Sequence, residues 1–242
     1  MTRGFLPPQH GAWAMLAVPY AAGVLAGGWA WPAGPLAGAW LAGYPLSYYL
    51  LQAVKTGRPG RWRAQLIGYA VPVLVLAAVV VVARPAVLRY APAFTALWAV
   101  NAWYAWHRRE RALLNDLASV VQGCLIVFVV ATVAGTGPAA VAGAFAACLS
   151  YFAGTALFVK TMIRERGDPA YRRWSVGYHA AALVLATWLG PALGVLFGWL
   201  LVRAWLLPGR RAGPGRLAPR QVGLIEVANS LLLLVAVGVT YG

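Results

Sequence analysis

The sequence predicts an all-α protein, a polytopic bundle of about nine transmembrane helices. Three observations support this fold class. Of the 242 residues, 62% are hydrophobic and only 10% are charged, whereas a soluble domain has about 45–50% apolar and about 25% charged residues. The apolar residues fall into runs near the length of about 20 residues that a membrane-spanning helix needs. The connections between these runs are short and rich in Gly, Pro and Arg, as turns between helices should be.

The first four predicted spans are residues 11–28, 33–54, 63–82 and 88–106. The first of them begins so close to Met1 that it resembles a signal peptide. The polar residues 8–10 at its start, and the lack of a small-residue cleavage pattern near residues 29–31, favour a retained helix instead.

The remaining predicted spans are residues 113–133, 138–158, 175–189, 191–207 and 221–239. Glycines recur every fourth residue on two of the nine spans, at Gly23 and Gly27 and at Gly190, Gly194 and Gly198. This spacing is typical of closely packed membrane helices. Most of the twelve tryptophans lie near helix ends, as in the aromatic belts of membrane proteins.

Two stretches of sequence resemble each other. Residues 46–49 and 54–56 are followed by a basic loop, and residues 149–152 and 159–161 are followed by another. This repetition indicates two four-helix pseudo-repeats, about residues 8–106 and 113–207, with a last helix at 221–239, all within one transmembrane domain over residues 1–242. A chance match in a chain of such low complexity is the alternative.

The basic residues predict the orientation of the chain. With the N-terminus in the cytoplasm, 18 of the 20 Lys and Arg fall on the cytoplasmic side, and only Arg84 and Arg89 fall outside. Because cytoplasmic loops carry an excess of Lys and Arg, we expect a multi-pass protein of the cell membrane with a cytoplasmic N-terminus and an extracytoplasmic C-terminus. The formal charge of +15 is therefore a topology signal. A nucleic-acid partner is not expected, since such a protein concentrates its charge on a soluble face.

The start of the fifth span carries a polar stripe. Asn115, Ser119 and Gln122 follow an i, i+4, i+7 spacing and therefore share one helix face, and Asp116 lies on the adjoining face. Asp116 is either a helix-capping residue or a catalytic base or metal ligand. Because the stripe continues two turns deeper, we predict a site in which Asn115 and Gln122 bind substrate.

The last span repeats this pattern with Glu226, Asn229 and Ser230. A charged group at the centre of a membrane helix costs about 2.5–3.5 kcal/mol, so it needs a specific reason to be there. Glu226 either forms a buried ion pair with an Arg or Lys of a neighbouring helix, or belongs to a substrate or ion site. We predict a catalytic role for Glu226 and substrate binding for Asn229.

Cations and histidines supply the other candidates. Lys160 and Arg164 follow an i, i+4 spacing, and together with Lys55 they are candidates to hold a phosphate. The alternative is that they are topology signals alone. His10 and His179 lie near predicted helix starts; each is either a satisfied interfacial residue or part of the site, His10 as a base and His179 in substrate binding. The sequence has no Gly-rich phosphate loop, no His pair with metal spacing and no Ser nucleophile elbow.

Three blocks of the sequence resemble the YwiC-like family of bacterial membrane proteins. They are residues 8–15, 109–116 and 159–166, the last followed by Ser175 and His179. The resemblance covers nearly the whole chain and implies an integral membrane protein, but it assigns no reaction.

A more distant resemblance is to the UbiA-type intramembrane prenyltransferases, which have nine helices in two pseudo-repeats. In that family, two Asp-rich motifs bind magnesium diphosphate from the connections after the second and sixth helices. Here residues 52–63 contain no acidic residue, and the acidic residues among 164–168 are only Glu165 and Asp168. The cofactor is therefore unknown, and Mg²⁺ is weakly supported because it is usually held by one or two carboxylates together with phosphate oxygens.

These observations lead to three functional hypotheses. The first is a UbiA-like transferase that acts on an isoprenoid or phosphate-headed lipid at the cytoplasmic leaflet. Lys55, Lys160 and Arg164 would then hold the phosphate. The second is a non-catalytic partner of a membrane complex, whose protein partners are unknown. The third is a small-molecule transporter, which would need polar residues at both ends of the bundle, whereas here they gather at one end.

Overall fold

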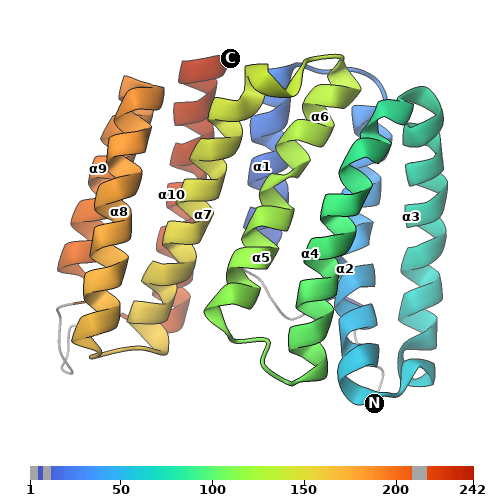
Figure 1. Ribbon diagram of the computed structural model, residues 1–242, viewed down its shortest axis with the longest axis horizontal. Coiled ribbons are helices and arrows are strands. Elements are labelled where there is room, and N and C mark those ends of the chain that lie inside the picture. Colours follow the sequence, from blue (N-terminus) through green and yellow to red (C-terminus); the bar gives the residue numbers. More distant parts are fainter. Residues whose placement is uncertain (1–4, 8–11, 209–216) are drawn as a thin grey trace. The chain divides into compact units, whose positions relative to one another are not determined.

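The computed structural model describes residues 5–7, 12–208 and 217–242. Across these residues the chain is helical and contains no strand, which confirms the predicted all-α class (Figure 1). The chain divides into two compact units, an N-terminal unit, Met1–Val141, and a C-terminal unit, Ala142–Gly242. This division differs from the predicted boundary between pseudo-repeats, and the internal duplication stays a prediction.

The N-terminal unit consists of six α-helices, with short 3₁₀ helices between α2 and α3 and between α3 and α4. The helices are α1 (Ala12–Gly27), α2 (Ala33–Thr56), α3 (Arg63–Ala83), α4 (Ala91–Trp106), α5 (Leu113–Cys124) and α6 (Ile126–Ala134). Helix α2 packs against α3 and α4, α1 against α6, and α4 against α5. The predicted fifth span consists of two short helices, α5 and α6, that meet at Leu125. There the Phe128 N–H donates to the Leu125 carbonyl, with an N–O distance of 3.1 Å, in a tight i, i+3 turn.

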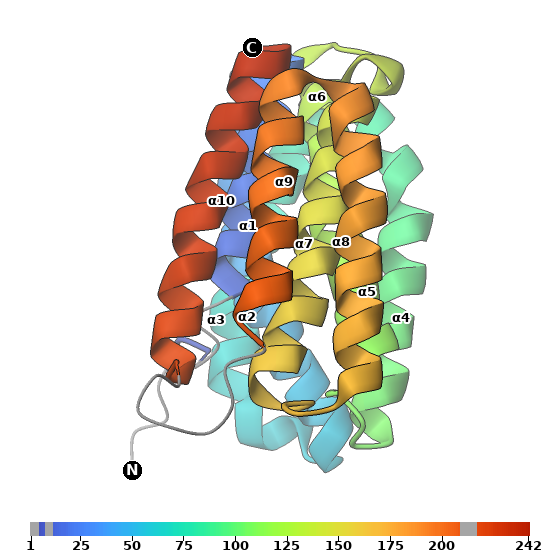
Figure 2. The same cartoon turned by 90° about the vertical axis from the view of Figure 1, so that its left-hand side faces the viewer.

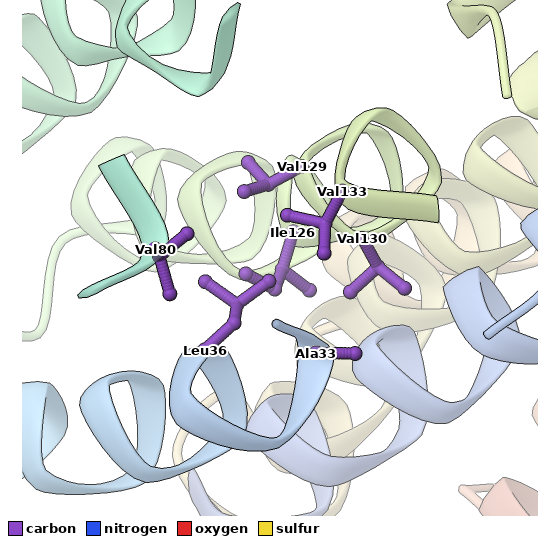
Figure 3. Packing of buried hydrophobic residues seen from close by; sticks show 7 residues of the cluster. All are labelled: Ala33, Leu36, Val80, Ile126, Val129, Val130 and Val133. Atoms are coloured by element: carbon purple, nitrogen blue, oxygen red, sulfur yellow. The ribbon is translucent and has the colours of Figure 1, made fainter. Parts of the chain in front are cut away.

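A cluster of aliphatic side chains forms the core of this unit (Figure 3). Its buried members come from α2, α3 and α6 and are Ala33, Leu36, Val80, Ile126, Val129, Val130 and Val133. Figure 3 shows the four α6 side chains gathered opposite Leu36 and Val80. The predominance of β-branched residues on α6 suits this position, because their stiff side chains lose little further freedom on packing.

Close packing of α1 on α6 depends on two glycines. A Cβ at Gly23 would lie 3.0 Å from Val130 Cβ, and a Cβ at Gly27 would lie 2.8 Å from Ala131 Cβ. The role in helix packing predicted from the glycine spacing is therefore confirmed for α1. On α9, the same holds for Gly194, where a Cβ would lie 2.9 Å from a side-chain carbon of Thr187.

Arg84 and Arg89, the two cations predicted to lie outside, bind the end of α6. Arg84 Nε donates to the Val133 carbonyl at 3.0 Å, and Arg89 Nη2 donates to Thr132 Oγ1 at 2.6 Å. Positive groups at a helix C-terminus satisfy its free carbonyls and complement its dipole. These two arginines are therefore explained by the local structure of the N-terminal unit.

The C-terminal unit consists of four long helices, α7 (Ala142–Ile163), α8 (Pro169–Leu189), α9 (Pro191–Leu206) and α10 (Pro219–Tyr241). Helix α7 contacts α8 and α10, and α9 also contacts both, so that the four helices surround a common interior (Figure 2). The predicted seventh span, residues 175–189, begins too late. Asp168 caps α8 by accepting from the N–H groups of Ala170 at 2.8 Å and Tyr171 at 3.2 Å, and Pro169 occupies the first helical position.

Four of the described helical stretches are long and apolar enough to cross a membrane. They are Pro59–Ala83, Leu113–Ala134, Pro138–Ile163 and Pro219–Tyr241, and Ala12–Gly27 and Pro191–Leu206 are shorter apolar helices. Their outward faces carry exposed aliphatic side chains, for example Leu74 and Val82 on α3 and Val235 on α10. The other predicted spans stay predictions as membrane crossings.

Candidate functional site

A buried ion pair joins α9 and α10 inside the C-terminal unit. Arg203 Nη1 donates to Glu226 Oε1, and the two residues are only 2% and 9% exposed. Thr155 of α7 donates its hydroxyl to the second carboxylate oxygen, Glu226 Oε2, at 2.8 Å. Both oxygens of the carboxylate are therefore engaged. The Arg or Lys partner that the sequence predicted as an alternative for Glu226 is Arg203.

The guanidinium of Arg203 also contacts α7 and α8. Its Cζ lies 3.9 Å from the ring centroid of Phe158, a cation–π contact. Its Nη2 lies 3.5 Å from His179 Nε2, and His179 Nδ1 lies 2.7 Å from the Ser175 carbonyl. Because a carbonyl only accepts, Nδ1 carries the proton and the Nε2 lone pair faces the guanidinium. All four helices of the unit thus contribute to the surroundings of the ion pair.

A second polar layer lies one turn further along α10. Trp199 Nε1 donates to Asn229 Oδ1 at 3.1 Å. The Tyr151 hydroxyl donates to the Glu226 carbonyl at 3.0 Å and lies 3.1 Å from Ser230 Oγ. Three buried polar atoms in this region have no hydrogen-bond partner within the part of the chain that the structure describes: Ser175 Oγ, Arg203 Nε and Asn229 Nδ2. Such atoms are rare in folded proteins and call for a specific explanation.

The pattern of α10 explains why these polar groups face inward. Its buried residues include Val222, Glu226, Asn229, Leu233 and Val237, at spacings of three and four. These positions form one face of a helix. The opposite face carries exposed aliphatic side chains. This arrangement, polar inside and apolar outside, is the one a bilayer favours, because ionisable residues in membrane helices face the bundle interior.

Two residues of the polar stripe of α5, Ser119 and Gln122, contact α4 in the N-terminal unit. Asn101 of α4 donates to Gln122 Oε1 at 3.0 Å and accepts from Ser119 Oγ at 3.2 Å. Asn115 Nδ2 donates to the Glu110 carbonyl at 2.9 Å. Ser119, Asn101 and Gln122 therefore form a chain of hydrogen bonds between the two helices, whereas Asn115 bonds to the α4–α5 connection. Substrate binding by Asn115 and Gln122 stays a prediction.

Asp116 lies in the first turn of α5 and is half-buried. The N-cap residue of this helix is Ala112, whose carbonyl accepts from the Asp116 N–H at 3.1 Å. Asp116 is therefore not the capping residue, although its charge complements the helix dipole. Its catalytic role stays a prediction.

Lys55, a predicted phosphate ligand, forms an ion pair with Glu110. Lys55 Nζ lies 2.5 Å from Glu110 Oε1, and each side chain is about one third exposed. The pair connects the end of α2 to the connection between α4 and α5. Partial burial alone would raise the pKa of the Glu110 carboxyl, but the hydrogen bond from Lys55 and the nearby positive charges outweigh this and lower it.

Replacing Lys55 by Met should therefore change the pH dependence of stability. Because the pKa of Glu110 is lower in the folded protein than in the unfolded chain, the ion pair stabilises the fold above the unfolded pKa, and this stabilisation is lost as the pH falls through the folded pKa. We expect a loss of about 0.2–1 kcal/mol at pH 7, as for other partly exposed pairs, and a smaller loss at pH 3. Thermal unfolding of both proteins across this range measures it; an equal difference at both pH values would contradict it.

The cations at the end of α7 differ in their surroundings. Lys160 is buried in the last turn of α7, whereas the side chain of Arg164 is exposed beyond the helix end. Their joint role in holding a phosphate stays a prediction. His10 lies outside the described residues. His179 lies in the middle of α8, because this helix begins at Pro169, and not at a helix start as predicted.

Metal ligation receives no support from the described residues. No three His, Cys, Asp or Glu side chains gather there in a way that could hold a metal ion. The charge of Glu226 is already compensated by Arg203, which opposes the binding of a further cation there. A role for Mg²⁺ stays a prediction.

The sequence did not single out Arg203, Tyr151, Thr155 or Asn101. Arg203 lies in the last turn of the predicted span 191–207, where the excess of cytoplasmic arginines explains it as a topology signal alone. The available signal was its position on an apolar helix, where a cation needs a partner as much as an anion does.

The four described helical stretches that are long and apolar enough to cross a membrane place the chain with helical membrane proteins by length and composition. The chain belongs to the YwiC-like protein family, whose model matches residues 6–131. It is 29% identical to an uncharacterized protein named YwiC from Bacillus subtilis (strain 168), over 96% of each chain. It is also 30% identical to an uncharacterized protein from Haemophilus influenzae, over 94% of this chain and 96% of that one. The resemblance to this family predicted from the sequence is thus confirmed.

No solved structure matches the chain. The more distant resemblance to the UbiA-type fold therefore stays a prediction.

Proposed function

We propose that this protein is an integral membrane protein that binds a phosphate-headed lipid, an isoprenoid diphosphate or a phospholipid, at the cytoplasmic leaflet of the cell membrane. The observation that carries the proposal is a pocket of about 540 Å³ in the C-terminal unit, between the α7–α8 connection and the end of α9. Two arginines, Arg172 and Arg173, line it together with Trp205. Its size is within the range of small-molecule sites, roughly 300–1,000 Å³.

The lining suits a lipid headgroup at the membrane surface. Arginine is well matched to phosphate, because its planar guanidinium offers parallel N–H donors. Arg172 Nη2 donates to the Trp205 carbonyl at 2.7 Å, which fixes one arginine at the edge of the pocket. Trp205 and Leu206 are exposed. An indole beside aliphatic side chains is typical of the boundary between lipid headgroups and acyl chains.

The pocket lies close to the buried ion pair along two helices. Thr161 lines the pocket and follows Phe158, the residue under Arg203, by three positions on α7. Val176 lines the pocket and precedes His179 by three positions on α8. Three residues are nearly one helical turn, a rise of about 4.5 Å. A lipid headgroup in the pocket would therefore sit nearly one turn from a cluster of ionisable groups.

A UbiA-like transfer reaction is the catalytic form of this proposal. An isoprenoid diphosphate would then be the substrate, Lys160 and Arg164 would add to the phosphate contacts, and Glu226 would act as base. Because both oxygens of Glu226 are engaged, binding is better supported than catalysis.

Lipid analysis of the purified protein tests the proposal. We expect a phosphate-headed lipid to copurify, and its addition to raise the melting temperature of the delipidated protein. In Arg173→Ala, the lipid concentration needed for the same rise in melting temperature should be about tenfold higher, because a charged hydrogen bond is lost. Arg220→Ala, an exposed arginine of α10 outside the pocket, is the matched control. Identical melting with and without phosphate-headed lipids would overturn the proposal.

A non-catalytic role in a membrane complex is the second candidate. It is favoured by the closed hydrogen bonding of Glu226, which is what a structural ion pair requires. A variant that lacks both charges of the pair and still inserts should keep the cellular phenotype if the protein is a scaffold.

A further inference from the structure

We propose that the pocket beside the α7–α8 connection selects a zwitterionic headgroup, the phosphoethanolamine group of a phospholipid, over a diphosphate. This inference rests on the proposed lipid binding and names the chemistry of the headgroup. It follows from the charges that line the pocket. Arg172 and Arg173 are accompanied by two acids, Glu165 and Asp168, so the described residues of the lining offer as many anions as cations.

The partners of these four side chains leave both signs of charge accessible. Asp168 Oδ1 accepts the two capping N–H groups of α8, and its other oxygen has no hydrogen bond to a described residue. Arg172 uses one nitrogen for the Trp205 carbonyl and keeps its other donors. Glu165 is half-buried and Arg173 is exposed, so the charges of both side chains can be reached from the pocket.

Electrostatics separates the ligand classes. A diphosphate carries more than one negative charge and would meet the arginines together with two repelling carboxylates. Like charges repel more strongly near a protein surface than in bulk water, because the effective dielectric constant is lower there, so each uncompensated carboxylate matters. A phosphoethanolamine headgroup instead places its phosphate against arginine and its ammonium against a carboxylate.

Hydrogen bonding separates ethanolamine from choline. A primary ammonium donates three N–H bonds, which carboxylate oxygens accept. A quaternary ammonium has no N–H to donate, so it would meet the carboxylates through its charge alone and could also lie over an aromatic ring such as that of Trp205. The exposed Val202 and Leu206 on α9 provide an apolar surface beside the pocket for the acyl chains.

The experiment compares ligands on the full-length delipidated protein in detergent. Melting is measured with phosphatidylethanolamine, phosphatidylcholine, phosphatidylglycerol and geranylgeranyl diphosphate, and with water-soluble glycerophosphoethanolamine. We expect phosphatidylethanolamine to stabilise the protein at concentrations at least about tenfold lower than the other four. Glu165→Gln should remove the preference over phosphatidylglycerol, and Glu110→Gln, in the N-terminal unit, should keep it.

The outcomes separate this inference from the proposed function. Equal or stronger stabilisation by phosphatidylglycerol or geranylgeranyl diphosphate would overturn the proposed preference for a zwitterionic headgroup, but it would still support lipid binding. Equal stabilisation by phosphatidylcholine would overturn the role of N–H donors. If glycerophosphoethanolamine acts as well as the lipid, the ligand is the free headgroup and the lipid source is wrong. If none of the five stabilises the protein, both proposals fail.

Discussion

Replacing Arg203 by Ala is expected to lower the free energy of unfolding by about 3–5 kcal/mol, because removing one partner of a buried ion pair leaves an uncompensated charge. The carboxylate of Glu226 would keep only the hydroxyl of Thr155. The loss of the contact between the guanidinium and the Phe158 ring adds to the effect. For a protein of this size each kcal/mol shifts the melting temperature by roughly 2–4 °C, so thermal unfolding in detergent should show a fall of roughly 6–20 °C.

Two further variants test the cause of this loss. Arg220→Ala removes an exposed arginine from the same unit and should change stability by about 0.5 kcal/mol or less. Replacing Arg203 and Glu226 together by Met removes both charges at similar volume and should restore most of the stability, since buried ion pairs contribute little net energy over apolar isosteres. If Arg203→Ala and Arg220→Ala have the same melting temperature, the ion pair between Arg203 and Glu226 is not formed.

The boundaries of several helices were predictable because apolar runs set them. The predicted spans 33–54 and 63–82 differ from α2 and α3 by two residues or fewer at each end. Helix α8 was predicted too short because Arg172 and Arg173 make its first turns polar. The capping signal of Asp168 followed by Pro169 was present in the sequence, and it marks the start of the helix better than hydropathy does.

The part of the candidate site that lies on α10 was predictable because its polar residues interrupt an apolar run. Glu226 and Asn229 stand out because polar residues in an apolar span are expensive. Arg203 does not, since an arginine near a span end is explained by topology alone. Its pairing with Glu226 depends on how α9 packs against α10, and no local pattern encodes that contact. The pocket likewise combines residues from three helices.

Replacing Gly27 by Ala is expected to destabilise the N-terminal unit by about 1–3 kcal/mol, the usual effect of overpacking a close contact. The added Cβ would lie 2.8 Å from Ala131 Cβ and 2.9 Å from Ala131 Cα. Because one of these atoms belongs to the backbone of α6, a rotamer change cannot relieve the clash, and α1 and α6 must separate. That movement would also strain the bond of 2.7 Å from Thr136 Oγ1 to the Gly27 carbonyl.

Gly43→Ala is the matched control for this change. A Cβ at Gly43, inside α2, meets no atom within 4 Å. Since Ala is favoured over Gly in a helix by about 0.5–1 kcal/mol, this variant should melt at or slightly above the wild-type temperature, whereas Gly27→Ala should melt several degrees below it. Equal melting of the two variants would mean that α1 does not pack against α6 at Gly27, and the glycine spacing would then need another explanation than helix packing.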